Sequence, residues 1–309
     1  MAKDKTKSKD KKSDKKAKAP KVQGARWIEE TFHPEWRVAM KADRVLFEIE
    51  TEHQHLVIFE NKTWGRVLIL DGVFQLTTSD EFVYHEMMAH VPLMALERPT
   101  DVLIVGGGDG GVLREVLKHP GVKRAVLAEI DQAVIDTSLE FYPEIAGGAF
   151  NDERTEVVIG DGAQYVADST AAFDAIIVDS SEPIGPSAVL HQPEFFAACR
   201  EALKPGGILV TQNGLPFTAP AHLGEVTASL SKLFETVAPM TCTQPCYFGG
   251  PFALNTATNG AHPASIALET LKRRASRRKI TTRYWTPEVH AAAFALPRYI
   301  ADIVTNAKP

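Results

Sequence analysis

The alternation of apolar and polar positions between Arg44 and Thr77 predicts a small antiparallel sheet. Four apolar segments occur there, RVLFEIE, HLVIFEN, RVLIL and VFQLT, and polar turns separate them. The last turn holds the pair Asp71-Gly72, a combination that is typical of tight hairpins. We therefore predict four short strands in this region.

Helical spacing replaces this pattern near Ser79 and Asp80, which can cap a helix through EFVYHEMMAHVPLMAL. Pro92 lies within the segment and can kink the helix. The predicted apolar face comprises Val83, Met87, Val91 and Met94. This helix is expected to connect the N-terminal sheet with the rest of the chain.

After Pro99, buried strands alternate with helices. The predicted strands are DVLIV, AVLAEI, EVVIG, FDAIIV and GILVTQ, and the predicted helices are VLREVLKH and a segment from Gln132. This order is typical of parallel βαβ units with right-handed crossovers. The predicted fold class is α/β: a Rossmann-like, methyltransferase-type sheet rich in parallel strands, with a small N-terminal antiparallel β domain.

Composition divides the chain into a basic tail and an acidic body. Residues 1–21 hold ten Lys and three Asp, a charge of +7, which leaves −12 on the rest of a chain whose net charge is −5. Such a tail has no apolar surface to bury, and residues 1–23 are expected to be disordered. We assign residues 24–92 to the β domain and the start of the connecting helix, and residues 93–309 to the Rossmann-like catalytic domain.

Composition also argues against several classes of protein. No apolar run approaches the roughly 20 residues of a membrane helix, and the N-terminus lacks the apolar core of a secretory signal, so a cytoplasmic protein is expected. Cys199, Cys242 and Cys246 show no CxxC spacing, which predicts reduced structural thiols. The basic stretch from Lys272 to Lys279 is predicted to be a solvated helix face, and a nucleic-acid partner is not favoured.

A glycine-rich loop follows the first strand of the α/β region. Gly106, Gly108 and Gly111 fit the pattern GxGxxG between a strand and a helix, where the backbone can approach a ligand closely. Glu129 ends the next strand, 21 residues beyond Gly108, where an acidic side chain reaches the hydroxyls of a ribose. The combination predicts a site for a nucleoside.

Acidic residues occur at four successive strand ends. Asp109 follows the first strand of the α/β region and lies inside the glycine loop, where it disfavours a phosphate ligand. Glu129 ends the second strand, Asp161 follows the third and Asp179 follows the fourth. Each could be a helix cap or turn residue if taken singly. Because these strand ends line one crevice, and Glu182 lies near them, the set predicts a pocket for a cation that carries an adenosine, such as an S-adenosyl sulfonium compound.

One motif in the connecting helix resembles a metalloprotease site but does not predict one. His85 and His90 are five residues apart rather than four, which turns them about 140° from each other around the helix. We therefore predict no metal, and we expect His90 to be a packed or capping residue.

Several motifs together resemble the spermidine synthase family of polyamine aminopropyltransferases. They are GGGDGGVLREVLKH, LAEID, GDG, VDSSEPIGP, LDGVFQLTTSDEFVYHEMMAHVP and RYWTPEVHAAAFALPRY. The resemblance implies transfer of the aminopropyl group of decarboxylated S-adenosylmethionine, a co-substrate rather than a cofactor, to a diamine. With putrescine the products are spermidine and methylthioadenosine. It also implies a homodimer or homotetramer formed through the N-terminal region.

The resemblance also implies roles for individual residues, which fall into three sets. Asp179 would lie at the reaction centre, and our hypothesis is that it is the catalytic base, because the attacking nitrogen becomes acidic as its new C–N bond forms. The donor would be bound by Gln54, His85, Asp109, Glu129, Asp161 and Gly162. The acceptor amine would be held by Tyr84, Glu182, Gln212 and Tyr247, with Gln75 close to them.

The chain departs from the family pattern at the acceptor side. Glu182 stands where the family has Asp, and Gln244-Pro245-Cys246-Tyr247 replaces Ile-Pro-Thr-Tyr. One methylene of misfit typically changes specificity by about 10- to 200-fold. Putrescine is our first choice of acceptor, with 1,3-diaminopropane or cadaverine as alternatives.

Two other functions are compatible with a nucleoside site. One is an S-adenosylmethionine-dependent polyamine N-methyltransferase, and the other is a nucleoside-binding module without catalysis. Asp109 argues against the methyltransferase, because it would repel the carboxylate of ordinary S-adenosylmethionine and attract the amine of the decarboxylated donor. The presence of Asp179 and Tyr84 argues against a module without catalysis.

Overall fold

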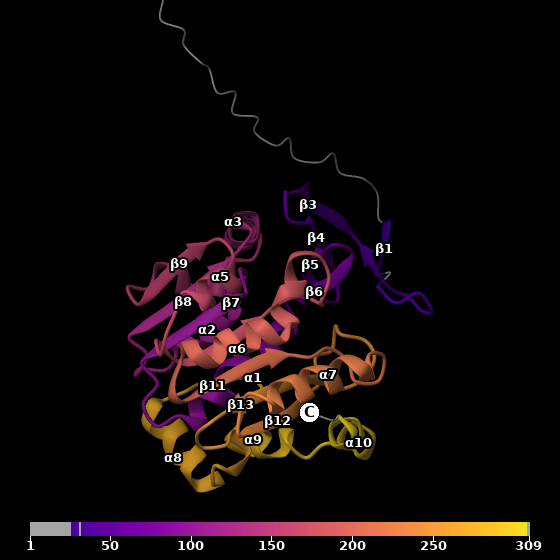
Figure 1. The fold of residues 1–309 in the computed structure, drawn as a ribbon. Coiled ribbons are helices and arrows are strands. Elements are labelled where there is room, and N and C mark those ends of the chain that lie inside the picture. Colours follow the sequence, from indigo (N-terminus) through magenta and orange to yellow (C-terminus); the bar gives the residue numbers. More distant parts are fainter. Residues whose placement is uncertain (1–25, 31, 308–309) are drawn as a thin grey trace, which may run out of the picture.

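The computed structural model describes residues 26–30 and 32–307, so the predicted disorder of the basic tail lies outside the described residues. This part of the chain forms sheets of two, four and seven strands. Figure 1 shows the short N-terminal strands, in indigo, beside the large sheet and its helices. The α/β class and the separate antiparallel region are confirmed.

The N-terminal strands form two antiparallel sheets. The four predicted segments are β3 (Arg44–Glu50), β4 (His55–Asn61), β5 (Gly65–Leu70) and β6 (Val73–Thr77), which pair in chain order. Two strands that were not predicted, β1 (Arg26–Glu30) and β2 (Val38–Ala42), pair with each other. Each has five residues and mostly partly or fully exposed positions, so its apolar content does not distinguish it from a loop.

The large sheet has the strand order β12-β13-β11-β10-β7-β8-β9. Its parallel strands are β7 (Asp101–Gly106), β8 (Arg124–Glu129), β9 (Thr155–Ile159), β10 (Phe173–Asp179) and β11 (Leu203–Gln212). The antiparallel edge consists of β12 (Thr236–Cys242) and β13 (Phe252–Thr258). The chain builds the sheet outward from β7 in one direction and then from β10 in the other. A crevice is expected at the carboxyl ends of these two strands.

Helices and short helical turns connect the strands. They are α2 (Gly111–Leu117), α3 (Gln132–Phe141), α4 (Pro143–Ala146), α5 (Gly162–Ala167), α6 (Pro193–Ala202) and α7 (Pro220–Ser231), with 3-10 turns at 149–151, 185–191 and 263–265. The C-terminal helices are α8 (Leu268–Arg278), α9 (Pro287–Ala293) and α10 (Arg298–Asn306). Within the described part of the chain, no helix combines the length and the apolar character needed to span a membrane.

Helix α1 (Glu81–Ala95) is buried on almost every side, so its burial includes the predicted apolar face of Val83, Met87, Val91 and Met94 and extends well beyond it. All of its residues except Phe82 are buried. The helix packs against α2, β10, β11, β12 and α8, which together leave it no solvent face. Sequence periodicity cannot reveal this arrangement, because it depends on partners that are distant in the chain.

Asp80 occupies the position before α1, but its side chain does not cap the helix. Its carboxylate accepts hydrogen bonds from Thr77 Oγ1 at 2.5 Å and from the backbone N–H of Cys246 at 2.7 Å. The predicted cap is therefore wrong. The carboxylate instead ties the loop that carries Cys246 to the end of β6.

The basic stretch in α8 is only partly a solvated face, because Arg274 and Arg278 turn toward the C-terminal end of α1. Arg274 Nη1 donates to the carbonyl oxygens of Met94 and Ala95 at 2.7 and 2.8 Å. The guanidinium of Arg278, which is 8% exposed, donates to the carbonyls of Leu93, Leu96 and Glu97. The last carbonyls of a helix lack partners within it, so these two side chains supply what α1 needs at that end.

The variant Arg278→Ala is expected to lower the free energy of unfolding by about 1–3 kcal/mol, because it strands buried carbonyl groups. The measurement is the denaturant midpoint followed by circular dichroism. The exposed neighbour Arg277 offers a matched control, and Arg277→Ala should change stability by no more than about 0.5 kcal/mol. Equal losses in the two variants would contradict the capping role.

Candidate active site

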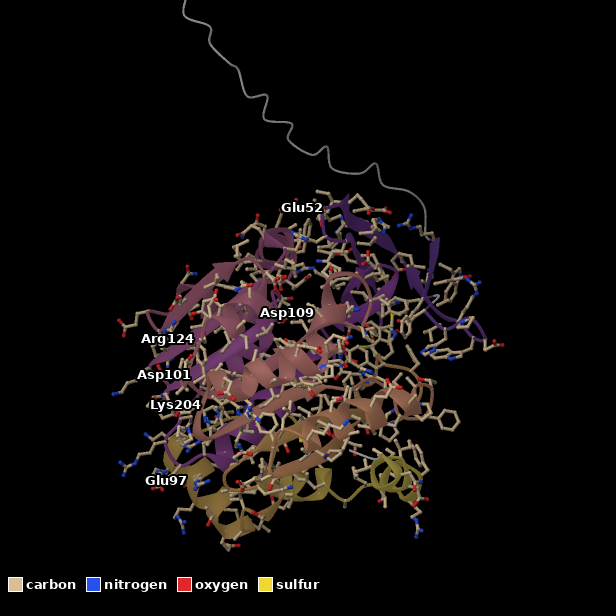
Figure 2. All side chains as sticks on the ribbon, in the orientation of Figure 1. Glu52, Glu97, Asp101, Asp109, Arg124 and Lys204 are labelled. Atoms are coloured by element: carbon tan, nitrogen blue, oxygen red, sulfur yellow. The ribbon has the colours of Figure 1, made fainter. Side chains whose placement is uncertain are left out.

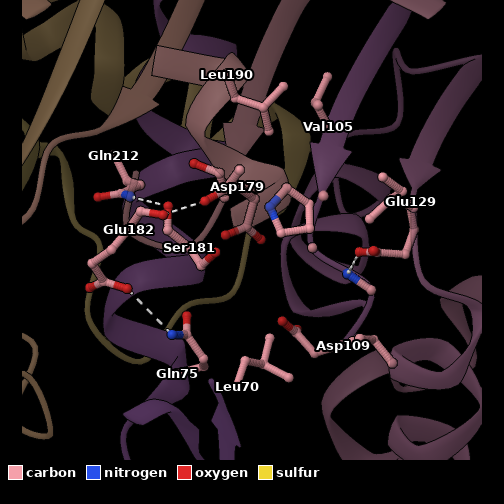
Figure 3. Close-up of a pocket in the computed structure, with 18 of the residues that line it drawn as sticks. Leu70, Gln75, Val105, Asp109, Glu129, Asp179, Ser181, Glu182, Leu190 and Gln212 are labelled. Atoms are coloured by element: carbon pink, nitrogen blue, oxygen red, sulfur yellow. Dashed lines mark hydrogen bonds between the residues drawn. The ribbon is translucent and has the colours of Figure 1, made fainter. Parts of the chain in front are cut away.

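A cavity lies at the carboxyl ends of β7, β8 and β10, and its opposite wall is formed by β5, β6 and two turn residues of the N-terminal sheet, Gln54 and Asp71. All of the residues proposed from the sequence line it: Gln54, Gln75, Tyr84, His85, Asp109, Glu129, Asp161, Gly162, Asp179, Glu182, Gln212 and Tyr247. Figure 3 shows Asp109 and Glu129 on one side and Gln75, Glu182 and Gln212 on the other, with Asp179 between them. The structure therefore brings the donor and acceptor sets together in one place.

The glycine loop after β7 makes room for three of these side chains. A Cβ on Gly107 would lie 2.6 Å from Asp179 Oδ2, and one on Gly108 would lie 2.9 Å from Glu129 Oε2. A Cβ on Gly111 would lie 2.1 Å from Nδ1 of His85. Each of these glycines thus lets a polar side chain of the site approach the loop, in addition to any ligand.

Backbone groups orient the acids on the donor side. Glu129 accepts hydrogen bonds from the N–H groups of Gly108 at 3.1 Å and Asp131 at 2.9 Å, and burial raises its pKa to about 7. Asp161 is also a helix cap, since its Oδ1 accepts from the N–H groups of Ala163 and Gln164 at the start of α5. The helix-cap interpretation of Asp161 and its place in the cavity are thus both realised.

Gln54 reaches the site through a residue that the sequence interpretation missed. Gln54 Nε2 donates to Asp131 Oδ2 at 3.0 Å, and Thr51 Oγ1 donates to the same oxygen at 2.8 Å. Asp131 also caps α3 by accepting from the Ala133 N–H. The sequence did contain a signal for the helix cap, because Asp131 stands directly before the helix predicted from Gln132. The hydrogen bonds of Asp131 with Thr51 and Gln54 of the β domain could not be predicted from the sequence.

Three ionisable groups meet at the centre of the cavity. Nε2 of His85 lies 3.4 Å from Asp109 Oδ1, and potential ligand atoms of His85, Asp109 and Asp179 all lie within 4.8 Å of one another. Burial together with the charge of Asp109 raises the pKa of Asp179 to about 7. Burial alone would lower the pKa of His85, but Asp109, Glu81 and Asp179 raise it to about 9.

These three groups have a spacing that could hold a metal ion. Nδ1 of His85 lies 2.6 Å from Glu81 Oε2, so Nε2 is the ring nitrogen that faces Asp109 and Asp179. The absence of a metal stays a prediction, and an organic cation is the ligand that we consider below.

The acceptor side combines carboxylates with an aromatic wall. Glu182 accepts from Gln75 Nε2 at 3.4 Å, and Gln212 Nε2 donates to the carbonyl oxygen of Ser181 at 2.9 Å. Tyr247 donates its hydroxyl to the carbonyl of Gln75 at 2.6 Å, which joins this loop to β6. The rings of Tyr84 and Tyr247 meet edge to face with centroids 6.3 Å apart. Oδ2 of Asp179 is buried and has no hydrogen-bond partner among the described residues.

Gln244 and Cys246, the other departures from the family pattern, do not line the cavity. Both are buried, with exposed fractions of 2% and 1%, and Gln244 Nε2 lies 3.4 Å from Cys246 Sγ. They lie behind Tyr247 because Asp80 holds the backbone of Cys246 inward. The interpretation that they belong to the acceptor surface is therefore corrected: they can act on the acceptor only indirectly, and Cys246 packs in one cluster with Phe74 and Tyr247.

Glu81 and Arg114 are site residues that the sequence interpretation missed. Glu81 Oε2 lies 2.6 Å from His85 Nδ1 and 2.9 Å from Arg114 Nη2. The spacing of Glu81 and His85, four residues apart on one helix, was a usable signal. His90 is packed away from the cavity, as expected, with its Nε2 3.0 Å from Glu115 and its Nδ1 2.9 Å from His119.

A second cavity continues the first on the acceptor side. The two share Val73, Glu182, Gln212, Tyr247 and Phe252. The second is also lined by Glu30, Phe32, His33, Phe74, Pro183, Gly214, Leu215, Thr218, Ala219, His222 and Phe248. Burial raises the pKa of Glu30, and the charge of Glu182 adds to this effect, although the Phe74 N–H that Glu30 accepts opposes it. This chamber was not predicted, because β1 and its loop were not.

The two ends of the large sheet differ in how their acids are neutralised. Figure 2 shows Asp101 and Lys204 together, away from Asp109. Lys204 Nζ lies 2.6 Å from Asp101 and 3.1 Å from Asp174, so those acids are paired within the protein. At the carboxyl ends, none of the cavity carboxylates forms an ion pair with a Lys or Arg among the described residues. Fold and site together define a methyltransferase-like α/β enzyme whose pocket is suited to cations.

Comparison with known proteins identifies the family to which this α/β enzyme belongs. Residues 81–262 match the family described as spermine/spermidine synthase domain, and residues 26–78 match the spermidine synthase tetramerisation domain. The chain belongs to the spermine/spermidine synthase family of polyamine aminopropyltransferases, as its motifs predicted.

Relatives and solved structures support this assignment over most of the chain. The polyamine aminopropyltransferase of Pseudomonas syringae is 44% identical over 90% of this chain and 98% of its own, and polyamine aminopropyltransferase 1 of Pseudomonas aeruginosa is 45% identical over 89% and 96%. A spermidine synthase solved in complex with the transition-state analogue AdoDATO is 34% identical with a TM-score of 0.87, covering 94% of this chain and 98% of its own. Spermidine synthase from Thermotoga maritima is 33% identical with a TM-score of 0.84, covering 96% and 99%.

Proposed function

We propose that the protein transfers the aminopropyl group of decarboxylated S-adenosylmethionine to putrescine, which gives spermidine and methylthioadenosine. The observation that carries this proposal is the set of cavity carboxylates without Lys or Arg partners in the described chain. Donor and acceptor are both polycations, and a partly desolvated anionic pocket attracts them strongly. A similar chain is known in complex with a transition-state analogue, which supports the assignment.

Asp109 accounts for selection of the decarboxylated donor. Its Oδ1 accepts the Gly111 N–H at 2.7 Å, which fixes the carboxylate at the mouth of the glycine loop. From there it attracts the ammonium of the aminopropyl group and repels the carboxylate of ordinary S-adenosylmethionine. In this proposal Glu129 binds the ribose hydroxyls, and Asp161 and Gly162 contact the adenine.

The reaction is an in-line displacement. The lone pair of the acceptor amine forms a C–N bond with the methylene next to sulfur, and the C–S electron pair leaves on sulfur. One proton of the attacking amine goes to Asp179, whose pKa of about 7 suits a general base at neutral pH. Positioning of both substrates in one cavity supplies much of the remaining rate.

The acceptor is held at its far end by Glu182 in this proposal, with Tyr84, Gln212 and Tyr247 around its methylene chain. Putrescine remains the first choice. The second cavity beyond Glu182 favours cadaverine over 1,3-diaminopropane as the runner-up, because it offers space for a longer chain and a further carboxylate, Glu30.

The variant Glu182→Asp is expected to shift the ratio of kcat/KM values from putrescine toward cadaverine by about tenfold or more, because the shorter side chain moves the distal ammonium site outward by one methylene. The check is initial rates with each diamine at a fixed donor concentration. The donor KM serves as the internal control and should not change. A ratio equal to that of the parent would show that Glu182 does not set acceptor length.

The test of the function itself uses the purified protein with decarboxylated S-adenosylmethionine and each diamine in separate reactions. Mass spectrometry should detect methylthioadenosine and the aminopropylated amine in equal amounts. Ordinary S-adenosylmethionine is the matched control and should give no product. A methylated amine in that control would instead support an N-methyltransferase.

The assembly and location of the enzyme complete the proposal. A homodimer or homotetramer built through the N-terminal strands is supported by the match of residues 26–78 to a tetramerisation domain. Light scattering of the purified chain measures the assembly directly. We place the enzyme in the cytoplasm, with no resident cofactor and no nucleic-acid partner.

A further inference from the structure

The imidazole of His85 is held rigidly from behind. Its Nδ1 lies 2.6 Å from Glu81 Oε2, and both side chains are buried, with exposed fractions of 4% and 6%. Arg114 fixes the carboxylate of Glu81 with two N–H groups, at 2.9 and 3.3 Å. The ring also lies against the backbone of Gly111, where a side chain would collide with it. This is the arrangement of a carboxylate and a histidine in which the carboxylate sets the tautomer and the other ring nitrogen handles protons.

That other nitrogen, Nε2, faces the reaction cavity. It lies 3.4 Å from Asp109 Oδ1, and Asp179 is the third member of the same close cluster. The groups around the ring are therefore Glu81 and neighbouring Tyr84 from its own helix, Asp109 from the glycine loop and Asp179 from the end of β10. Arg114 acts from α2 through Glu81. These carboxylates stabilise an imidazolium, and a cation bound among them would compete with it for their charge.

We propose, on the basis of the aminopropyl transfer argued above, that Glu81 and His85 form a proton-carrying dyad: His85 loses its Nε2 proton when the dicationic donor binds beside Asp109, and then receives, through Asp179, the proton that the acceptor amine sheds. Glu81 is the positioning residue of this pair. It stays ionised, because His85 and Arg114 lower its pKa to about 2 although burial opposes them.

The proton balance of the reaction agrees with this sequence. A doubly charged donor and a doubly charged diamine give a triply charged triamine, neutral methylthioadenosine and one proton. In the dyad scheme that proton leaves from His85 on donor binding. The acceptor's own proton then restores the imidazolium, the C–N bond forms as the C–S bond breaks, and the products depart from a site in its starting state.

The test is isothermal titration calorimetry of the full chain with decarboxylated S-adenosylmethionine, without acceptor, in buffers of different ionisation enthalpy. At pH 8 the pKa of about 9 keeps His85 mostly protonated in the empty site, whereas Asp179 and Glu129, with values near 7, are mostly ionised. About one proton should be released for each donor bound. Methylthioadenosine, which is neutral, should release none.

Variants separate the dyad from a merely structural role. His85→Gln should bind methylthioadenosine like the parent but release no proton with the decarboxylated donor. Glu81→Gln should release less at pH 8, because loss of the carboxylate lowers the pKa of the free imidazole. His262→Gln, a histidine at the 3-10 turn outside both cavities, is the matched control and should release as the parent does.

Two results would overturn the dyad. One is equal proton release with the decarboxylated donor and with methylthioadenosine in the parent protein. The other is undiminished release in both His85→Gln and Glu81→Gln. Product analysis by mass spectrometry tests the proposed function separately. A protein that releases the proton but makes no aminopropylated amine would contradict the proposed function, while the response of the dyad to the donor would still stand.

Discussion

The variant Asp179→Asn should lose about 100- to 10,000-fold in kcat, while its affinity for methylthioadenosine should stay within about twofold of the parent. Asn keeps the size of the side chain and can accept hydrogen bonds, but it cannot take a proton from the acceptor amine. Burial and Asp109 together raise the pKa of Asp179 to about 7, so the carboxylate can take up and give back a proton near neutral pH. The measurement is steady-state turnover with saturating donor and diamine.

The pH dependence of kcat/KM in the parent enzyme provides a second test of Asp179 as the catalytic base. Asp179 must be ionised to act as a base, so kcat/KM should fall as the pH drops below about 7. The variant should lack this acid limb. Asp168→Asn, at the exposed end of α5, is a matched substitution and should retain the parent rate and profile. Near-parent turnover in Asp179→Asn would remove Asp179 from the role of base.

Replacing Asp109 with Asn should weaken binding of the decarboxylated donor by about 2–5 kcal/mol, or roughly 30- to several-thousand-fold, because a buried charge loses its partner. The amide can still accept the Gly111 N–H, so the glycine loop should keep its shape. Binding of neutral methylthioadenosine should hardly change. The measurements are the donor KM and calorimetric affinities for the three nucleosides.

Ordinary S-adenosylmethionine completes the Asp109 experiment. Its carboxylate no longer meets a like charge in the variant, so it should bind more tightly than it binds the parent. The ratio of affinities for the two sulfonium compounds is therefore the decisive quantity. If this ratio is the same in both proteins, donor selection lies elsewhere in the cavity.

The sequence predicted those parts of the fold whose signals are local. The four segments from Arg44 to Thr77 and the strands after Pro99 are continuous or alternating apolar runs between turn residues, and each forms a strand where expected. The errors concern partners that are distant in the chain. Periodicity on α1 could not show that its polar side would also be covered, nor that Arg278 would lie against its end.

The candidate site shows the same division. The acids at the carboxyl ends of β7, β8 and β10 could be grouped in advance, because parallel topology brings such ends to one edge. Glu81, Arg114 and Asp131 were missed, since they act through side chains that meet only after folding. The second cavity escaped notice because it depends on where β1 and its loop come to rest.

The two arginines that hold the C-terminal end of α1 bear on how the chain folds. The same helix carries Tyr84 and His85 near its other end, and β10 and β11 pack against it. Arg274 and Arg278 bind carbonyls that lie 179 to 185 residues away along the chain. Because contacts between such distant residues form only after the intervening chain has become compact, we expect the helix that bears His85 to be secured late in folding.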